Sequence, residues 1–180
     1  LEVRGEAVIR LPVLEEYNRT HPDEPLKNAR NAAAGAIRNL DPKVTASRRP
    51  EIIFYDINYM SDAPVSSQQE AVSRLREWGF QTFPYFRVCG SFDEVRAAVD
   101  EIEVGRKSLD VLTDGAVIKT DSEATRRLMG YTDKFPRWAI AYKFEAEEAE
   151  ATVERVIWQV GRTGKLTPLA FITPVELAGA

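Results

Sequence analysis

Two lysines lie on strand-like segments beside small residues, an arrangement that suits the binding of an anion. In Asp114-Gly-Ala-Val-Ile-Lys119, the two-residue period of a strand places Lys119 on one face with a glycine and a valine. In Trp138-Ala-Ile-Ala-Tyr-Lys-Phe144, Lys143 shares a face with two alanines. Because small neighbours leave room, a lysine in such a cavity needs an anion to stay charged, and a nucleotide phosphate suits it. The alternative is that each lysine reaches solvent at the end of its strand.

Glu6 follows a glycine on the polar face of an alternating segment, residues 1–7. Because Gly5 has no side chain, a ligand can approach the strand closely there, and a carboxylate at Glu6 can accept hydrogen bonds from a ribose hydroxyl. The alternative is an ordinary solvent-facing glutamate.

Arg30 and Arg38 flank the small residues of a predicted helix over residues 28–40. Eight residues of an α-helix bring the two side chains to within about 80° of each other, so both guanidinium groups can reach one side. Paired guanidinium groups suit phosphates. The alternative is an alanine-rich helix in tight packing with surface arginines. Arg106, shortly before Asp114, adds a further basic position.

The composition excludes several kinds of site. Of the 180 residues 44% are hydrophobic and 29% are charged, and the sequence has a single cysteine, Cys89, and a single histidine, His21. These two residues cannot form a disulfide within the chain or a tetrahedral zinc site, and a buried, reduced thiol favours a cytoplasmic location. No apolar run approaches the roughly 20 residues of a membrane span, so no membrane partner is expected. The net charge of −4 neither favours nor excludes a phosphate-rich partner.

The hydrophobic patterns predict an α+β fold, because helices and strands are mixed without a repeating βαβ unit. Strands are predicted at residues 1–7, 52–58, 82–88, 114–120 and 138–144, and a hairpin at residues 153–160 and 166–173. Helices are predicted at residues 12–17, 28–40, 68–78 and 123–129, and after the capping box Ser91–Glu94. Asp41-Pro42 is expected to end the second helix, and Trp78 to face the core.

Five strings of residues occur in an order that points to one family. They are Glu2-Val-Arg-Gly-Glu6, Arg30-Asn-Ala-Ala-Ala-Gly35, Asp114-Gly-Ala-Val-Ile-Lys119, Pro136-Arg-Trp-Ala-Ile-Ala-Tyr-Lys-Phe144 and Gln159-Val-Gly-Arg-Thr-Gly164. With these strings the chain closely resembles the bacterial NAD-dependent DNA ligases over essentially its whole length. The resemblance implies a DNA-ligase-type, ATP-grasp-like nucleotidyltransferase domain with mixed, largely antiparallel sheets over residues 1–146. The start of an OB-fold β-barrel is expected over residues 147–180.

In that family a lysine attacks NAD and becomes lysyl-AMP, AMP passes to a DNA 5′-phosphate, and the 3′-hydroxyl at the nick displaces AMP. The resemblance therefore implies NAD and Mg²⁺ as cofactors, and NAD or AMP and nicked duplex DNA as partners of a monomeric, cytoplasmic enzyme. Zinc is expected only in a C-terminal part that this chain lacks.

The same resemblance assigns roles to individual residues. Glu6 would hold the ribose, Tyr55 would stack on the adenine, and Lys119 and Lys143 would contact the AMP phosphate as catalytic groups. Asp114 would act with them and help to hold Mg²⁺. The residues assigned to nucleotide and DNA phosphates are Arg30, Arg38, Arg106 and Arg162.

The chain departs from the family at the nucleophile, because the motif Lys-x-Asp-Gly does not occur in it. Leu112 stands where that lysine would precede Asp114-Gly115. We therefore expect the chain to be a fragment of a ligase, inactive by itself, that carries part of the active site. The alternative is a natural, non-catalytic relative that binds nucleotide or DNA.

Overall fold

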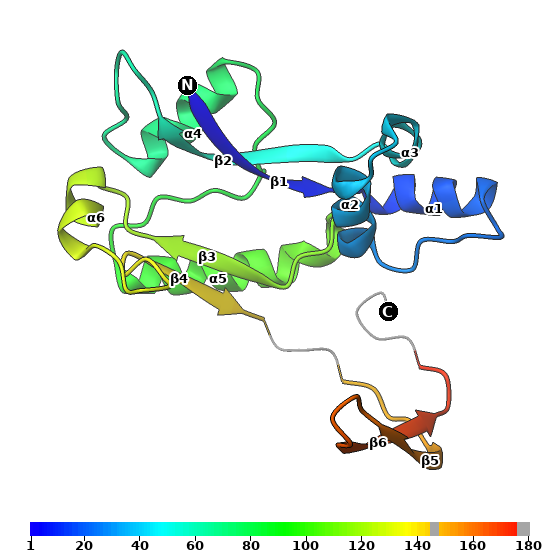
Figure 1. The fold of residues 1–180 in the computed structure, drawn as a ribbon. Helices are drawn as coiled ribbons and strands as arrows, with labels where there is room; N and C mark the ends of the chain where they lie inside the picture. The colour runs from blue at the N-terminus through cyan, green and yellow to red at the C-terminus, as the bar shows by residue number, and fades with distance from the viewer. Residues whose placement is uncertain (145–147, 176–180) are drawn as a thin grey trace. The chain divides into compact units, whose positions relative to one another are not determined.

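A computed structural model describes residues 1–144 and 148–175, and the chain divides into two compact units at residue 144. The first unit contains, in chain order, β1 (Glu2–Val8), α1 (Leu11–Thr20), α2 (Ala29–Arg38), α3 (Pro42–Arg48), β2 (Glu51–Tyr59), α4 (Gln68–Glu77), α5 (Phe92–Gly105), the short 3-10 helix η1 (Arg106–Ser108), β3 (Gly115–Lys119), α6 (Glu123–Met129) and β4 (Ala139–Lys143) (Figure 1). The second unit contains β5 (Val153–Val160) and β6 (Leu166–Ile172). Helices and strands are mixed and the described sheets are all two-stranded and antiparallel, which confirms the α+β prediction.

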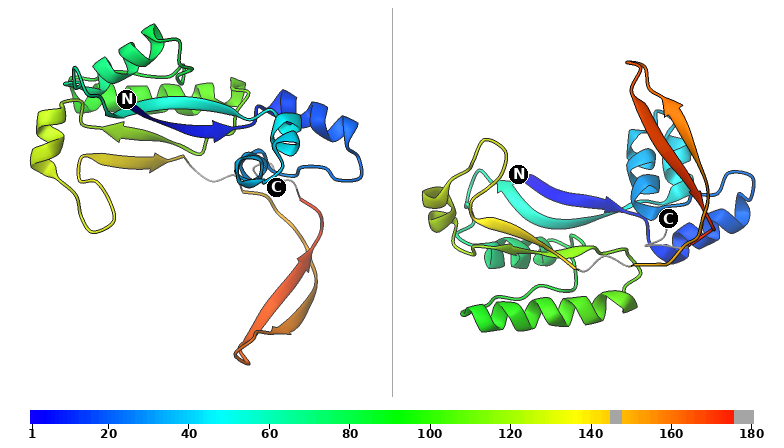
Figure 2. Two further views of the ribbon diagram at one scale, coloured as in Figure 1. Left: turned by 45° about the horizontal axis from the view of Figure 1, so that its top comes forward. Right: turned by 90° about the horizontal axis from the view of Figure 1, so that it is seen from below.

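β1 and β2 pair antiparallel and lie side by side in every view (Figure 2). Gly5 of β1 faces Phe54 of β2 at an irregularity in the register. A Cβ at Gly5 would lie 2.9 Å from the carbonyl oxygen of Ile53 and 2.6 Å from Cγ2 of Ile52. The close approach of the two strands therefore requires glycine at this position.

Helix α4 packs on this sheet and closes the main core. Ile57 of β2 and Ala71 and Leu75 of α4 form a buried cluster, with Leu75 fully covered. The predicted inward stripe of α4 is thus confirmed, except at Trp78, which is 44% exposed. That prediction was wrong because α4 ends at Glu77 and Trp78 lies in its C-cap, outside the helical period.

Helix α2 turns its alanines toward the end of β1. Ala32 and Ala33 pack with Ile9, and the Asn28 side chain caps the helix by accepting from the Asn31 amide. The alanine run therefore serves close packing against protein. The next helix, α3, was missed, because Pro42 begins it as its first residue while the Asp41 side chain accepts from the Lys43 amide.

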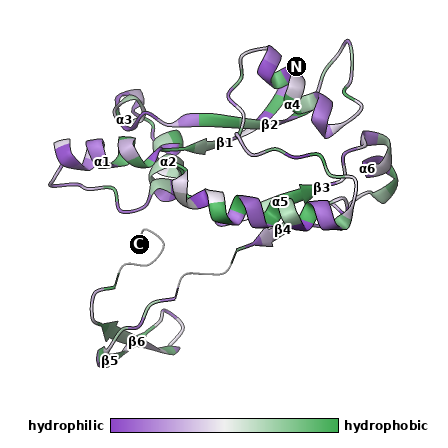
Figure 3. Ribbon diagram, turned by 180° about the vertical axis from the view of Figure 1, so that it is seen from behind, coloured by the Kyte–Doolittle hydropathy of each residue, from purple (hydrophilic) through white to green (hydrophobic). Residues whose placement is uncertain are grey.

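β3 and β4 form a second antiparallel pair, in which Gly115 faces Lys143 and Lys119 faces Ala139. Helix α5 contacts β3, and hydrophobic and hydrophilic segments alternate along it (Figure 3). Its capping box is confirmed, because the Ser91 hydroxyl accepts from the Glu94 amide.

The strand predicted at residues 82–88 is absent from the structure. Only Thr82 forms an isolated bridge, to Phe54. Pro84 follows in the same segment and has no N–H to donate to a ladder, which explains why pairing stops there. Cys89, beyond it, is partly rather than fully buried.

The second unit is a hairpin whose turn contains Gly164 at φ 81°. The Arg155 guanidinium carbon lies 4.0 Å from the centre of the Phe171 ring. Most of its side chains are exposed, Trp158 and Val160 among them, and the described residues of this unit do not form a barrel. Across residues 1–144 and 148–175, no helix is long and apolar enough to cross a membrane.

Candidate functional site

Lys119, the last residue of β3, lies in a cluster of side chains from three elements. Its Nζ is 3.1 Å from Oδ2 of Asp56 on β2, and it donates to Oε1 of Gln68 on α4 over 3.3 Å. The side chains of Lys119 and Asp56 are only 19% and 13% exposed. Asp56 therefore supplies the negative charge that a half-buried lysine needs, a partner that the sequence pattern of β3 did not indicate.

The amide of Gln68 and the guanidinium of Arg126 form the buried floor of this cluster. Gln68 is 6% exposed and Arg126 is 4% exposed. Gln68 donates through Nε2 to the Tyr55 carbonyl oxygen at 2.7 Å and accepts from Nη2 of Arg126 at 2.9 Å.

Arg126 is bound on several sides. Its Nε donates to the Thr120 carbonyl oxygen, its Nη1 donates to Glu123 at 2.7 Å, and its guanidinium carbon lies 4.5 Å from the centre of the Trp138 ring. A buried guanidinium with this set of partners fixes the end of β3.

The starts of α4 and α6 are tied together by the main chain. The Gln68 amide donates to the Asp121 carbonyl oxygen at 3.0 Å, and the Glu123 amide donates to the Ser66 carbonyl oxygen at 2.9 Å. The Asp121 carboxylate also accepts from the Gln69 amide at 2.9 Å, which places a negative charge at the N-terminus of α4. The two helices thus begin from one shared junction.

Tyr55 offers an aromatic surface next to Lys119. The Lys119 Nζ lies 4.9 Å from the centre of the Tyr55 ring, which is 38% exposed. Burial raises the pKa of the Tyr55 hydroxyl, the charge of Arg4 opposes this, and the charges of Glu6 and Asp56 add to it. Glu6 itself is exposed on β1, opposite Ile53. The structure therefore places Lys119 against the Tyr55 ring, with Glu6 on the strand that pairs with the strand of Tyr55.

Lys143 lies on the same face of the β3–β4 hairpin as Lys119 but at its other end. Its partner across the ladder is Gly115, and the partner of Lys119 is Ala139. Four residues of strand separate the two positions by about 13 Å along the hairpin. Lys143 is exposed, so the two predicted phosphate-binding lysines have different surroundings.

Arg30 and Asp114 approach each other beside that second end. Nη1 of Arg30 is 3.5 Å from Oδ2 of Asp114, and the two side chains are 72% and 71% exposed. Asp114 supplies one carboxylate, and magnesium is commonly held by one or two carboxylates together with substrate phosphates. The residue therefore fits an ion that arrives with a nucleotide. In the described parts of the chain, no group of three His, Cys, Asp or Glu side chains could hold a metal alone.

The other predicted phosphate-binding arginines are not gathered with Lys119. Arg38 is exposed at the last residue of α2. Arg106 is half-buried, donates to the Thr113 carbonyl oxygen at 3.1 Å, and lies 4.8 Å from the centre of the Phe144 ring. Arg162 is exposed in the turn of the second unit.

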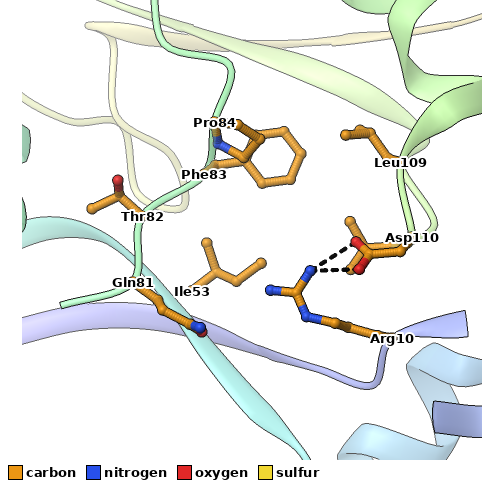
Figure 4. A pocket seen from close by; sticks show the side chains of 9 residues that line it. Arg10, Ile53, Gln81, Thr82, Phe83, Pro84, Leu109 and Asp110 are labelled. Atoms are coloured by element: carbon orange, nitrogen blue, oxygen red, sulfur yellow. Dashed lines mark hydrogen bonds and ion pairs between the residues drawn. The ribbon is translucent and has the colours of Figure 1, made fainter. Parts of the chain in front are cut away.

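A separate small cavity of about 190 Å³ lies between β2 and the segments around residues 81–84 and 109–111 (Figure 4). Arg10 points toward Asp110 there, and its Nη1 is 2.8 and 2.7 Å from the two carboxylate oxygens, while its Nε is 2.8 Å from Glu51. These contacts, Asp110 first, raise the pKa of the Arg10 guanidinium. None of the residues predicted to bind a nucleotide lines this cavity.

Three residues of the Lys119 cluster were not found from the sequence. Gln68 had a signal, because it stands at the start of the buried stripe of Ala71, Val72 and Leu75, where an apolar residue is usual. Asp56 had none, because Lys119 is 63 residues away in the chain, and the contact of Arg126 with Gln68 spans 58 residues.

Comparisons with known proteins identify the family. The family model described as NAD-dependent DNA ligase adenylation domain matches residues 1–147. A protein named DNA ligase from Finegoldia magna is 51% identical over 98% of this chain, and one from Alkaliphilus metalliredigens is 50% identical over 99%. A further DNA ligase, from Clostridium perfringens, is 46% identical over 99% of the chain. The chain spans 27% of the length of each of these relatives. The match covers β1 to β4 and with them the Lys119 cluster, so this chain belongs to the NAD-dependent DNA ligase adenylation domain family.

Proposed function

We propose that this chain is part of an NAD-dependent DNA ligase that seals nicks in duplex DNA, and that the Lys119 cluster binds the AMP part of NAD. The observation that carries the proposal is the half-buried ammonium of Lys119 beside the partly exposed ring of Tyr55. A cation next to an aromatic face matches a phosphate joined to a planar base. Membership of the ligase family supports the choice of NAD as the source of AMP.

In the proposed binding mode the adenine stacks on the Tyr55 ring and a ribose hydroxyl donates to Glu6. Lys119 lies next to Tyr55, and in this binding mode its ammonium turns from Asp56 to the α-phosphate. Lys143 approaches the same phosphate from the other end of the hairpin face. The two charges would stabilise the negative charge that develops during phosphoryl transfer.

The proposed reaction begins when a lysine in a Lys-x-Asp-Gly motif elsewhere in the longer protein attacks the α-phosphorus of NAD. A nitrogen–phosphorus bond forms, the phosphorus–oxygen bond to the β-phosphate breaks, and nicotinamide mononucleotide leaves. AMP then passes to the 5′-phosphate at a nick, and the 3′-hydroxyl displaces it. Mg²⁺, held by Asp114 with the nucleotide phosphates, would supply positive charge at the phosphates.

The exposed arginines are assigned to the nucleic acid. Arg30 and Arg38 present two guanidinium groups from the ends of α2, and we assign them to phosphates of the DNA or nucleotide. Arg106 and Arg162 carry the same assignment. Residues 1–146 form the adenylation domain in this proposal, and residues 147–180 begin an OB-fold domain.

The experiment that tests this proposal uses the full-length protein that carries this chain. After incubation with NAD and Mg²⁺, intact-mass spectrometry should show one added AMP, and ATP in place of NAD should give none. Added nicked duplex should then be sealed. The 180-residue chain is the matched control and should gain no AMP, because it has no Lys-x-Asp-Gly motif.

Two outcomes would overturn the proposal. A full-length protein that is folded and binds nicked DNA but takes no AMP from NAD would favour the non-catalytic relative, the alternative that the absent motif leaves open. An AMP adduct on a lysine of the isolated chain would show that one of these lysines is the nucleophile, which contradicts the phosphate-binding roles of Lys119 and Lys143.

A further inference from the structure

Gln68 stands between the two parts of the site that bind different parts of the nucleotide in the proposed function. Its side-chain amide donates to the main chain of Tyr55 and accepts from Lys119. Its orientation is fixed by its neighbours, because the reversed amide would point its oxygen at a carbonyl oxygen and its N–H groups at two cations. One amide therefore links the aromatic platform to the ammonium group.

The surroundings of Gln68 hold that amide still. Its main-chain amide donates to Asp121, and α4 is capped at the preceding residue by the Ser67 hydroxyl, which accepts from the Glu70 amide. Nη2 of Arg126 donates to Oε1 of Gln68 at 2.9 Å. With the side chain 6% exposed, little room remains for another rotamer.

The ammonium of Lys119 has three N–H donors, and the structure accounts for two of them. One is directed to the charged Asp56 and one to the neutral Oε1 of Gln68. A phosphate that binds the Lys119 ammonium competes with the negative charge of Asp56 and must displace it. Oε1 of Gln68 is neutral, so it can keep its hydrogen bond while the lysine turns to the phosphate. The neutral acceptor is thus suited to guide the lysine without neutralising it.

We propose that Gln68 is a positioning residue for AMP transfer, which sets the distance and direction between Lys119 and Tyr55. This inference rests on the proposed function, because it assigns Lys119 to the α-phosphate and Tyr55 to the adenine. Gln68 touches neither group of the nucleotide and acts through Lys119, whose ammonium it holds in place relative to the main chain of Tyr55.

The test compares Gln68→Met with Gln69→Met in the full-length protein. Gln69 is the adjacent, exposed residue of the same helix, so it controls for the loss of a glutamine at the start of α4. Single-turnover AMP transfer from saturating NAD should slow by about tenfold or more in Gln68→Met, the effect of a lost hydrogen bond to a charged group. The KM for NAD should change less than the rate, and Gln69→Met should behave like the wild type.

A double-mutant cycle separates positioning from damage to the fold. If Gln68 acts through Lys119, the Gln68→Met effect should vanish in a Lys119→Ala background, whereas a structural defect would persist there. Gln68→Glu is the second variant, because its carboxylate keeps an acceptor toward Lys119 and Arg126. It loses the donor to the Tyr55 carbonyl oxygen, so urea denaturation checks that this variant folds. Its added charge should hold the ammonium back and also slow transfer by about tenfold.

The outcomes distinguish this inference from the proposed function. A wild-type protein that forms no AMP adduct contradicts the proposed function itself. An active wild type with either Gln68 variant within threefold of its rate overturns the inference alone. Loss that persists in the Lys119→Ala background, or failure of both Gln68 variants to fold, would make Gln68 a structural residue and would overturn it equally.

Discussion

The β3–β4 hairpin carries a lysine near each end of one face, and the protein surrounds the two ends differently. At the first end Lys119 is held by β2 and α4, with a carboxylate and an amide as partners. At the other end Lys143 is exposed, and the nearby pair of Arg30 and Asp114 is more than two-thirds exposed. The same strand pattern thus leads to one preorganised charge and one that lies open to solvent.

The difference shows what a strand period can and cannot decide. Alternation fixes the face on which a side chain lies, and both lysines do share a face. How deeply a side chain on that face is buried depends on elements from distant parts of the sequence, since Asp56 and Gln68 are 63 and 51 residues from Lys119. The enclosed end is therefore expected to respond in stability as well as activity, and the exposed end in activity alone.

The largest expected effect is on AMP transfer. Lys119→Ala and Lys143→Ala in the full-length protein should each slow single-turnover transfer by about 100- to 1000-fold, because each removes an ammonium that faces the charge developing on the phosphate in the proposed transition state. Lys119→Ala should also lower the urea midpoint of unfolding, because it leaves Asp56 unpaired. Lys134→Ala, at an exposed lysine, is the control. Rates within a few-fold of the wild type would contradict the roles of both lysines.

Removing the buried arginine should give the next largest effect, in stability. Arg126→Met should lower the free energy of unfolding by about 3 kcal/mol, since Gln68 and Glu123 lose a buried partner. Arg127→Met, at the exposed neighbour in α6, should change it by less than about 0.5 kcal/mol. Urea denaturation of the two variants measures the difference. An equal loss in the free energy of unfolding for the two variants would mean that the contacts of Arg126 do not stabilise the enclosed end.

A smaller effect is expected in DNA binding, at Arg30 beside the exposed end of the hairpin and at Arg38 at the end of α2. Arg30→Gln and Arg38→Gln should each reduce the salt dependence of nicked-duplex binding by about 0.9 in the slope of log K against log salt. Arg127→Gln serves as the matched control on α6. Titration of binding by the AMP-loaded protein between low and high salt gives the slopes. An unchanged slope in both variants would leave these arginines without a DNA contact.

The smallest effect concerns the pH dependence of stability beside the enclosed end. Hydrogen bonds from the Ser66 amide and hydroxyl, with the charge of Arg74, lower the pKa of the Glu70 carboxyl. A lowered pKa in the folded state adds stability above the unfolded pKa, and this is lost as the pH falls through the folded value. Glu70→Gln should therefore narrow the difference in unfolding midpoint between neutral and acid pH. Ser66→Ala should show part of that change. If both variants keep the pH dependence of the wild-type unfolding midpoint, this prediction is wrong.

Much of the fold follows from local patterns. The periods of β1 and α4, the extent of α6 and the capping box of α5 are predicted from neighbouring residues, and the structure confirms them. The errors have local causes as well. Pro42 was interpreted only as the end of a helix, whereas it begins α3, and the apolar segment around Pro84 resembles a strand but does not pair as one.

The site could be predicted only in part. Lys119, Glu6 and Tyr55 were assigned from the strand pattern and the family resemblance, and the structure places Lys119 against the Tyr55 ring. The residues that hold Lys119 belong to elements that meet only after folding, so no spacing in the sequence joins Asp56 or Gln68 to it. A buried polar residue in an apolar stripe, as at Gln68, is the one local sign of such a network.

The shared junction at the starts of α4 and α6 has a consequence for how this region opens. Two main-chain hydrogen bonds run in opposite directions between the segments, from Gln68 to Asp121 and from Glu123 to Ser66. Neither helix can fray at its first turn without releasing the other, so the amide protons of Gln68 and Glu123 should exchange with solvent through a single opening event. Gln68, which accepts from Lys119, and α6, which carries Arg126, would then be released in the same event. Lys119 would therefore be held in position only while the junction is closed.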